Sequence, residues 1–348
     1  MDYIKIKTPD QAAMRRARQK WDSIAKPLHS LGIFEELIVQ LAGIYGSSEF
    51  DLQKKAVIVY CADNGAVSEG VAQSDSSVTF SVAESMADGR ANINIIAKSV
   101  GADVYVADVG MITDSGNENI ITKKAANGTG NIAAGAAMSA EQCRFAIRTG
   151  VDMVGRLRTE GVSIIATGEM GIGNTTTSSA MASVLLGRAP TELTGRGAGL
   201  SDEGFERKIF VIRRAIEINK PNPQNAFEVL QKLGGFDIAA MAGTFIGGML
   251  YSTPIVMDGF ISSVAALAAV KMVPECSPYI LASHASKEPA ASYVLEALGK
   301  KAVIHADMCL GEGTGAAMLF PLLDAAYAEY TSAHTFGDIK LEPYMPQK

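Results

Sequence analysis

The chain has 348 residues, of which 48% are hydrophobic and 20% charged, a composition typical of a globular protein with a sizeable core. Its 31 Lys and Arg residues are outnumbered by 37 Asp and Glu residues, and only 7% of the residues are aromatic. This balance argues against nucleic acid as the partner, because nucleic-acid binding needs a basic surface or a stacking platform.

The cysteines and histidines of the chain form no recognisable metal-binding or disulfide pattern. The four cysteines lie far apart without a C-x-x-C motif, and the four histidines are equally scattered. The N-terminal residues lack the apolar core of a signal peptide, and no apolar run is long enough to cross a bilayer. We therefore expect a cytoplasmic protein with no membrane partner, no metal site and no resident cofactor.

Two helices are predicted in the first 45 residues, followed by a repeated alternation of strands and helices. The helical patterns cover residues 8–26, which open with the cap and first-turn pair Thr8-Pro9, and residues 32–46, which end at a glycine. Short apolar runs that end in polar or glycine residues predict buried strands at 55–65, 102–110, 161–171, 253–260, 277–286 and, more weakly, 301–313. Helical patterns lie at 81–100, 175–187, 205–219, 261–273, 288–300 and 314–330, and the tail from 331 to 348 is predicted to be extended and exposed.

This alternation predicts an α/β fold: a Rossmann-like parallel sheet flanked by helices. We expect a large α/β domain over residues 46–289 and a smaller helical domain built from residues 1–45 and 290–348. Ligands bind such sheets at the carboxyl ends of the strands. Acidic, amide, hydroxyl and imidazole side chains occupy these ends here, at Asp63, Asn64, Asp108, Glu169, Asp258, Ser283, His284 and Glu312.

The stretch "ATGEMGIGNTTTSSAMASVLLG", residues 166–187, places Glu169 and a glycine-rich turn where a strand becomes a helix. The free backbone N–H groups of Gly171, Gly173 and the following threonines would suit a phosphate. An ordinary capped strand–turn–helix connection explains the pattern equally well. The loop lacks the lysine of an ATP-binding P-loop and the spacing of a dinucleotide fingerprint.

Two further glycine-rich loops carry one ionisable residue each. Glu312 sits between Gly311 and Gly313, where limited solvation would raise its pKa and suit a general base, although a solvated loop glutamate is the commoner case. Lys208 follows the loop that starts at residue 195 and would serve as a phosphate point charge, unless it is a surface lysine.

A serine hydrolase built on the adjacent Ser283 and His284 is a third possibility. It is disfavoured because no G-x-S-x-G elbow is present and because neighbouring residues do not supply triad geometry.

In their order along the chain, "CADNGAVSEGVA", "GEMGIGNTTTSSAM", "LGGFDIAAMAG", "YILASHAS" and "LGEGTGAAMLFPLLDAA" resemble the nicotinate-nucleotide–dimethylbenzimidazole phosphoribosyltransferase family. The resemblance implies transfer of the 5-phosphoribosyl group of nicotinate mononucleotide to an aromatic base. The products are an α-riboside 5'-phosphate, used for the nucleotide loop of cobamides (the vitamin B12 group), and free nicotinate. Such a displacement needs two reactants held in line and removal of one proton.

The resemblance also implies roles for individual residues. Glu312 matches the catalytic glutamate that removes the proton, and Glu169 matches a second active-site glutamate. The phosphate and ribose are expected at Gly171, Gly173, Asn174, Thr176, Gly197, Lys208 and Ser286, and the base pocket at Ser74, Val82 and Met170.

The chain departs from the family pattern in several places. Asn64 stands where the family usually has His, Leu28-His29 replaces Pro-Gly, and Pro289 replaces Gly. Val82 and Met170 replace Gln and Leu, which would make the base pocket more apolar and adaptable. The acceptor is therefore expected to be dimethylbenzimidazole, another benzimidazole, a purine or a phenolic compound.

The family resemblance implies a homodimer whose interface contributes to the active site. The departures also permit a heterodimer with a paralogue. In that case this chain would be a catalytically weak partner of an active phosphoribosyltransferase, although retention of Glu312, Glu169 and Lys208 argues against it.

Overall fold

The computed structural model describes residues 8–344 and contains one six-stranded, all-parallel sheet. The strand order is β3-β2-β1-β4-β5-β6, the doubly wound order, which confirms the predicted Rossmann-like α/β fold. The strands are β1 (Lys55–Ala62), β2 (Ala102–Gly110), β3 (Ile120–Thr122), β4 (Ile164–Met170), β5 (Ile255–Met257) and β6 (Ile280–Ala282).

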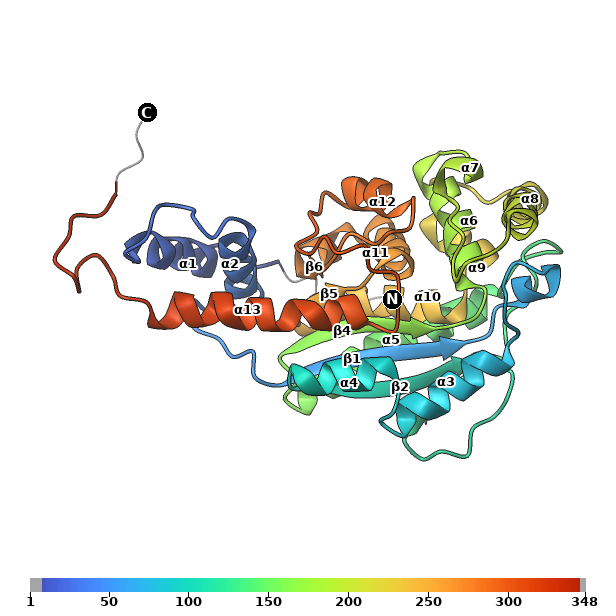
Figure 1. The fold of residues 1–348 in the computed structure, drawn as a ribbon, viewed down its shortest axis with the longest axis horizontal. Coiled ribbons are helices and arrows are strands. Elements are labelled where there is room, and N and C mark those ends of the chain that lie inside the picture. The colour runs from blue at the N-terminus through green and yellow to red at the C-terminus, as the bar shows by residue number, and fades with distance from the viewer. Residues whose placement is uncertain (1–7, 345–348) are drawn as a thin grey trace.

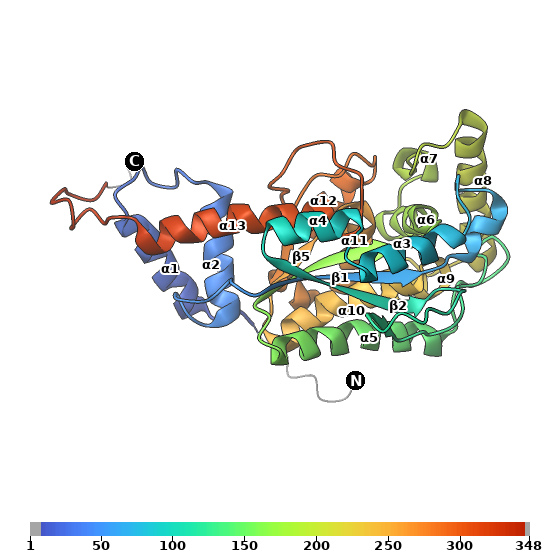
Figure 2. The ribbon, with the colours of Figure 1, turned by 60° about the horizontal axis from the view of Figure 1, so that its bottom comes forward.

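Helices cover both faces of the sheet, which explains why its central strands are uninterrupted apolar runs. All eight residues of β1 are buried. One face is covered by α3 (Ser77–Ala87), α4 (Asn92–Ser99) and α13 (Thr314–Ser332), and the other by α5 (Ala140–Thr159) and α10 (Phe236–Tyr251) (Figure 2). The backbones of α5 and α10 touch, since a Cβ on Gly150 would lie 2.7 Å from Thr244 N.

The remaining helices form groups around the sheet. The short helices η1 (Gly65–Glu69) and η2 (Pro274–Tyr279) follow β1 and precede β6, and α11 (Phe260–Met272) and α12 (Ala291–Leu298) pack against each other. A further group lies at one end of the molecule in Figure 1 and consists of α6 (Asn174–Leu186), α7 (Pro190–Leu193), α8 (Asp202–Asn219) and α9 (Ala226–Leu233).

The N-terminal helices lie at the opposite end of the molecule, beside the C-terminal part of α13 (Figure 1). They are α1 (Gln11–Ser23) and α2 (Ile33–Tyr45), as predicted. Trp21 of α1 packs on Tyr330 of α13 with ring centroids 5.1 Å apart. This pairing of the two chain ends fits a small helical domain, but the division at residues 45 and 290 remains a prediction, and residues 1–7 and 345–348 lie outside the described part.

Three predictions about elements were wrong. The weak strand at 301–313 is absent, and only Ile304 forms a bridge, with His284. The helix predicted at 81–100 is broken at Gly89 (φ +75°) into α3 and α4. The tail is not extended from 331, because α13 continues to Ser332 and a turn covers residues 336–340.

Seven elements were not predicted: β3, α5, α7, α9, α10 and the short helices η1 and η2. Helix α10 is apolar on nearly every side because it is buried between α5 and the sheet, so its sequence shows no 3.6-residue period.

Candidate active site

A pocket lies at the carboxyl ends of the strands, beside the point where the strand order reverses. The chain moves outward from β1 to β2 and β3, then returns to the other side of β1 as β4. Open parallel sheets bind ligands at such a switch point. Ten of the predicted site residues line this one pocket: Ser74, Glu169, Met170, Gly171, Gly173, Asn174, Gly197, Lys208, Ser286 and Glu312.

Two predicted residues do not line the pocket. Thr176 is fully buried within α6, and its neighbour Thr175 faces the pocket instead. Val82 is half-buried on α3, where it packs against the core.

One side of the pocket is built for an anion. Helix α6 begins after Gly173, which has φ +91° and provides no side-chain cap for the first backbone N–H groups. Lys208 Nζ donates to Thr175 Oγ1 at 2.9 Å and to the Gly195 carbonyl at 3.1 Å. An ammonium group has three donors, so these two acceptors leave one for a ligand. The helix dipole, a helix start without a side-chain cap and a lysine together suit a phosphate.

Lys208 is buried, which excludes the alternative that it is a surface lysine. Its side chain is fully buried, and this desolvation lowers its pKa to about 8. Gly197 (φ +54°) lies against it, because a Cβ at this position would be 3.2 Å from Thr175 Oγ1 and 3.5 Å from Lys208 Nζ. A glycine here keeps the space beside the lysine open for a ligand.

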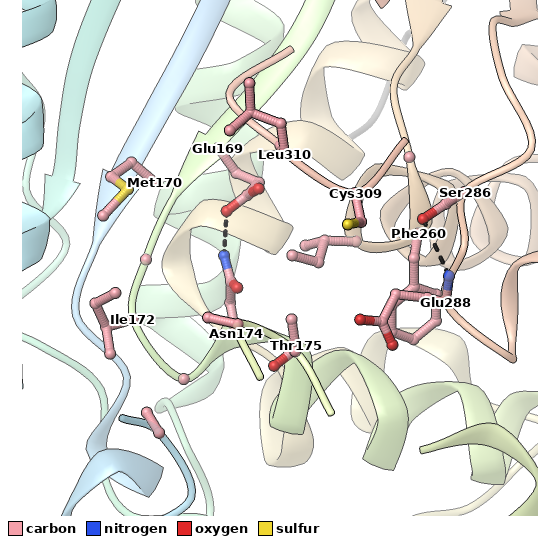
Figure 3. A pocket seen from close by; sticks show the side chains of 18 of the residues that line it. Glu169, Met170, Ile172, Asn174, Thr175, Phe260, Ser286, Glu288, Cys309 and Leu310 are labelled. Atoms are coloured by element: carbon pink, nitrogen blue, oxygen red, sulfur yellow. Dashed lines mark hydrogen bonds between the residues drawn. The ribbon is translucent and has the colours of Figure 1, made fainter. Parts of the chain in front are cut away.

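The opposite side of the pocket is acidic. Asn174 uses its amide nitrogen to bridge two buried carboxyl groups: it donates to Glu169 Oε2, and to Asp237 Oδ2 at 2.9 Å. Figure 3 shows the hydrogen bond from Asn174 to Glu169. Burial, with the nearby charge of Asp237 second, raises the pKa of Glu169 to about 8. Glu169 is therefore mostly a neutral acid at pH 7. The Asn174 side chain holds this acid in place, which is a different contact from the phosphate or ribose contact predicted for it.

Glu312 is held in an unusual backbone conformation at the start of α13. Gly311, Glu312 and Gly313 all have positive φ, at +85°, +61° and +85°. A glutamate in this region is uncommon and is retained only where the surroundings fix it. A Cβ on Gly168 of β4 would lie 2.5 Å from the Glu312 carbonyl oxygen, so the loop packs directly on the strand.

The side chain of Glu312 is fixed as well. Its Oε2 accepts the Ile93 N–H at 3.1 Å, at the start of α4. Burial raises the pKa of Glu312, as expected for a general base in a dry site. The prediction of a solvated loop glutamate is wrong, because this residue is only 8% exposed.

Asp258 and His284, at the ends of β5 and β6, support the Glu312 loop. Asp258 accepts the N–H groups of Gly313 at 3.2 Å and Ala316 at 2.9 Å, and its Oδ1 lies 3.8 Å from His284 Nδ1. Ser283 is fully buried and donates to the Met257 carbonyl at 2.7 Å, so it is no accessible nucleophile. The serine-hydrolase hypothesis is therefore wrong.

The sequence analysis missed three residues that shape the site, namely Thr175, Asp237 and Glu288. Asp237 carried a usable signal, since it is a lone acidic residue in the apolar segment of α10. Glu288 follows Ser286 on the loop after β6 and lines the pocket.

Between residues 8 and 344 no cluster of three or more His, Cys, Asp or Glu side chains is arranged to hold a metal ion. In the same part of the chain, none of the helices has the length and apolarity needed to span a membrane. The pocket thus combines an anion cradle with a fixed, desolvated carboxylate. These features define an enzyme that binds a phosphorylated substrate and removes a proton.

Comparisons with known proteins agree with this class. A family model described as phosphoribosyltransferase matches residues 6–340. The nicotinate-nucleotide–dimethylbenzimidazole phosphoribosyltransferase of Ruminiclostridium cellulolyticum is 47% identical over 341 residues, covering 98% of this chain and 97% of that protein. The enzyme of the same name from Clostridium acetobutylicum is 44% identical and covers 97% of this chain and 96% of its own.

A solved structure extends the agreement to the fold. CobT from Thermus thermophilus superposes with a TM-score of 0.91 at 36% identity, covering 96% of this chain and all of that one. The chain belongs to the nicotinate-nucleotide–dimethylbenzimidazole phosphoribosyltransferase family.

Proposed function

We propose that this chain transfers the 5-phosphoribosyl group of nicotinate mononucleotide to an aromatic base, releasing nicotinate and an α-riboside 5'-phosphate for cobamide assembly. One observation carries the proposal: a phosphate cradle at the start of α6 and a fixed, buried Glu312 face the same pocket. The names of the similar proteins support the identity of both substrates.

The geometry fits a single displacement. The phosphate binds at Thr175, Gly197, Lys208 and Ser286, which leaves the ribose between the cradle and the carboxyl groups. The acceptor atom attacks the anomeric carbon as the bond to nicotinate breaks, and Glu312 takes the acceptor's proton. Because nicotinate leaves with the electron pair of the broken bond, its ring nitrogen becomes neutral and needs no acid.

The two glutamates then have different roles. Glu312 is the base. Glu169, held neutral by burial, positions substrate through hydrogen bonds and contributes little counter-charge to the positive ribose of the transition state.

Met170 and Ser74 line the pocket and provide its acceptor end. The flexible thioether of Met170 adapts to rings of different shape. We therefore propose that the acceptor range includes benzimidazoles, purines and phenolic compounds. Val82 lies outside the pocket lining and would act on the acceptor only through the packing of α3.

We also propose that the active form is a homodimer. Helices α4 and α13, which hold Glu312, carry exposed apolar side chains at Ile95 (66% exposed), Met318 (41%) and Leu322 (38%). A second copy covering this face would fix the position of the base.

The cysteines support a proposal about the compartment. The four free thiols are Cys61, Cys143, Cys276 and Cys309, and free thiols fit a reducing cytoplasm.

The direct test uses the purified protein alone. It is incubated with nicotinate mononucleotide and a mixture of benzimidazoles, adenine, phenol and p-cresol, and the products are identified by mass spectrometry while light scattering gives the molar mass. We expect an α-riboside 5'-phosphate, free nicotinate and a dimer. A folded protein that yields no product would refute independent activity and favour the weak-paralogue alternative.

A further inference from the structure

Glu288 places a carboxyl group inside the phosphate cradle, where a second negative charge opposes binding. It lies on the loop between β6 and α12, two residues after Ser286, and faces the pocket together with Thr175 (Figure 3). Lys208 lines the same pocket. Nothing in the proposed displacement uses it.

The Glu288 side chain is packed tightly against the glycine loop that wraps the cradle. A Cβ on Gly195 would clash with its Oε2, and the backbone N–H of Gly197 faces the carboxyl group. Lys208 holds the same loop from the other side through the Gly195 carbonyl. Glu288 and Lys208 therefore both contact the loop at residues 195–197, where the phosphate is expected to bind.

One oxygen of the Glu288 carboxyl group lacks a hydrogen-bond partner. Oε2 is buried and has no hydrogen-bond partner among the described residues. A buried, unpaired carboxylate oxygen costs free energy, and protonation relieves that cost if the new O–H finds an acceptor. A phosphate oxygen in the cradle would be such an acceptor.

The charges around Glu288 decide its ionisation. Lys208 of α8 is the cation that acts on it, whereas burial opposes the charged form more strongly and raises the pKa of Glu288. Arg196 of the loop is paired with Asp202. The other ionisable side chains around the pocket are Glu169, Asp258, His284, Glu312 and the thiol of Cys309. Lys287 on the same loop is exposed. A phosphate dianion would add two negative charges beside Glu288 and push it further towards the acid.

We propose that Glu288 binds the substrate phosphate as a neutral carboxylic acid and takes up one proton from solution when the phosphate enters. This inference rests on the proposed function. In the empty site the carboxylate occupies the Gly197 N–H. In the loaded site the protonated group donates its O–H to a phosphate oxygen, and Gly197 is free to bind the phosphate.

The test measures binding without turnover. Nicotinate mononucleotide is titrated into the full chain, with no acceptor base, by calorimetry at pH 6, 7 and 8 in buffers of different ionisation enthalpy. Wild type is compared with Glu288→Gln, which keeps an N–H donor but cannot ionise. Glu288→Ala removes the donor, and Glu296→Gln on the exposed side of α12 is the matched control.

We expect wild type to take up close to one proton more than Glu288→Gln at pH 8. Its affinity should fall from pH 6 to pH 8 relative to that of Glu288→Gln, with a slope that approaches tenfold per pH unit at pH 8. Glu288→Gln should bind more tightly than wild type at pH 8, and Glu288→Ala more weakly than Glu288→Gln. Lys208 also gains protons near its pKa of about 8, and the Glu288 charge raises that pKa. Wild type and Glu288→Gln are therefore also compared in the Lys208→Met background, where this contribution is absent.

Weaker binding by Glu288→Gln at pH 8 would overturn the proposal, because it would mean that Glu288 acts as an ionised counter-ion of Lys208. Equal proton uptake by wild type and Glu288→Gln would overturn it as well. If the mononucleotide does not bind to wild type at any pH, the proposed function itself fails, which is a distinguishable result.

Discussion

The two sides of the pocket handle charge in opposite ways. The cradle at the start of α6 offers positive charge from fixed backbone N–H groups and one buried lysine, Lys208. The other side gathers carboxyl groups, and burial raises the pKa of each of them: Glu169, Asp237, Asp258 and Glu312. One side is prepared for a charge that the substrate brings. On the other side burial disfavours negative charge, which keeps Glu169 neutral and makes the ionised Glu312 a stronger base.

This contrast separates binding from chemistry. The phosphate has the same charge in the ground state and in the transition state, so its cradle should control KM. The proton leaves the acceptor only during the reaction, so the acidic side should control kcat. Mutations on the two sides should therefore move different kinetic parameters.

The largest effect is expected from Glu312→Gln, which preserves shape and removes the base. We expect kcat to fall about 10²- to 10⁴-fold with little change in KM for nicotinate mononucleotide. Steady-state kinetics with saturating acceptor would measure this, with Glu296→Gln as the control. A tenfold rise in KM at unchanged kcat would mean that Glu312 binds substrate and that the division between the two sides is wrong.

Lys208→Met on the other side should show the reverse pattern. Loss of one charge-assisted hydrogen bond to phosphate costs about 1.5–3 kcal/mol, so KM for the mononucleotide should rise about 10- to 150-fold. The methionine chain fills the buried space of the lysine, and exposed Lys271→Met serves as control. A loss confined to kcat would contradict a ground-state phosphate contact.

Local pattern indicated two features of the pocket, and the family resemblance indicated its other predicted residues. Glycines around Glu312 indicated a constrained carboxylate, and the threonines after Gly173 indicated a helix start. The bridge from Asn174 to Asp237 was not predictable, since it joins residues 63 positions apart. The burial of Lys208 also depends on tertiary packing, because its own helix has an ordinary amphipathic pattern.

Prediction of the fold from the sequence was limited in a similar way. Five of the six strands were found from apolar runs, whereas β3 has only the apolar pair Ile120-Ile121 between polar residues. The run at 301–313 resembles a strand, but only Ile304 reaches the sheet edge. Local composition indicated the central strands and the edge strand β6 correctly. It failed where the apolar run is very short, as in β3, and where an apolar run does not pair, as at 301–313.

Gly168→Ala tests whether the backbone beneath Glu312 matters as much as its side chain. The added Cβ would lie 2.5 Å from the Glu312 carbonyl oxygen and 2.7 Å from its carbonyl carbon, so the loop must shift. We expect about 1–3 kcal/mol of lost stability and a fall in kcat of about tenfold. Gly135→Ala is the control because nothing lies within 4 Å of its Cβ position. Unchanged kcat would show that the base tolerates movement.

Glu169→Gln should have the smallest effect of these variants. It tests whether burial keeps Glu169 protonated in the folded protein. In wild type the folded pKa of Glu169 is about 8, against 4.5 when unfolded, so between these values the folded state holds a proton that the unfolded state has lost. Stability should then fall as pH rises, by about 1 kcal/mol from pH 6 to pH 7. Gln cannot ionise, so the free energy of unfolding of Glu169→Gln, measured by urea unfolding at pH 6 and pH 7, should fall less than that of wild type.

The Asp237 contribution, with a folded pKa of about 6, is common to both proteins. Equal slopes would mean that Glu169 is ionised in the folded protein, and the acidic side would then act on the ribose as a full counter-charge.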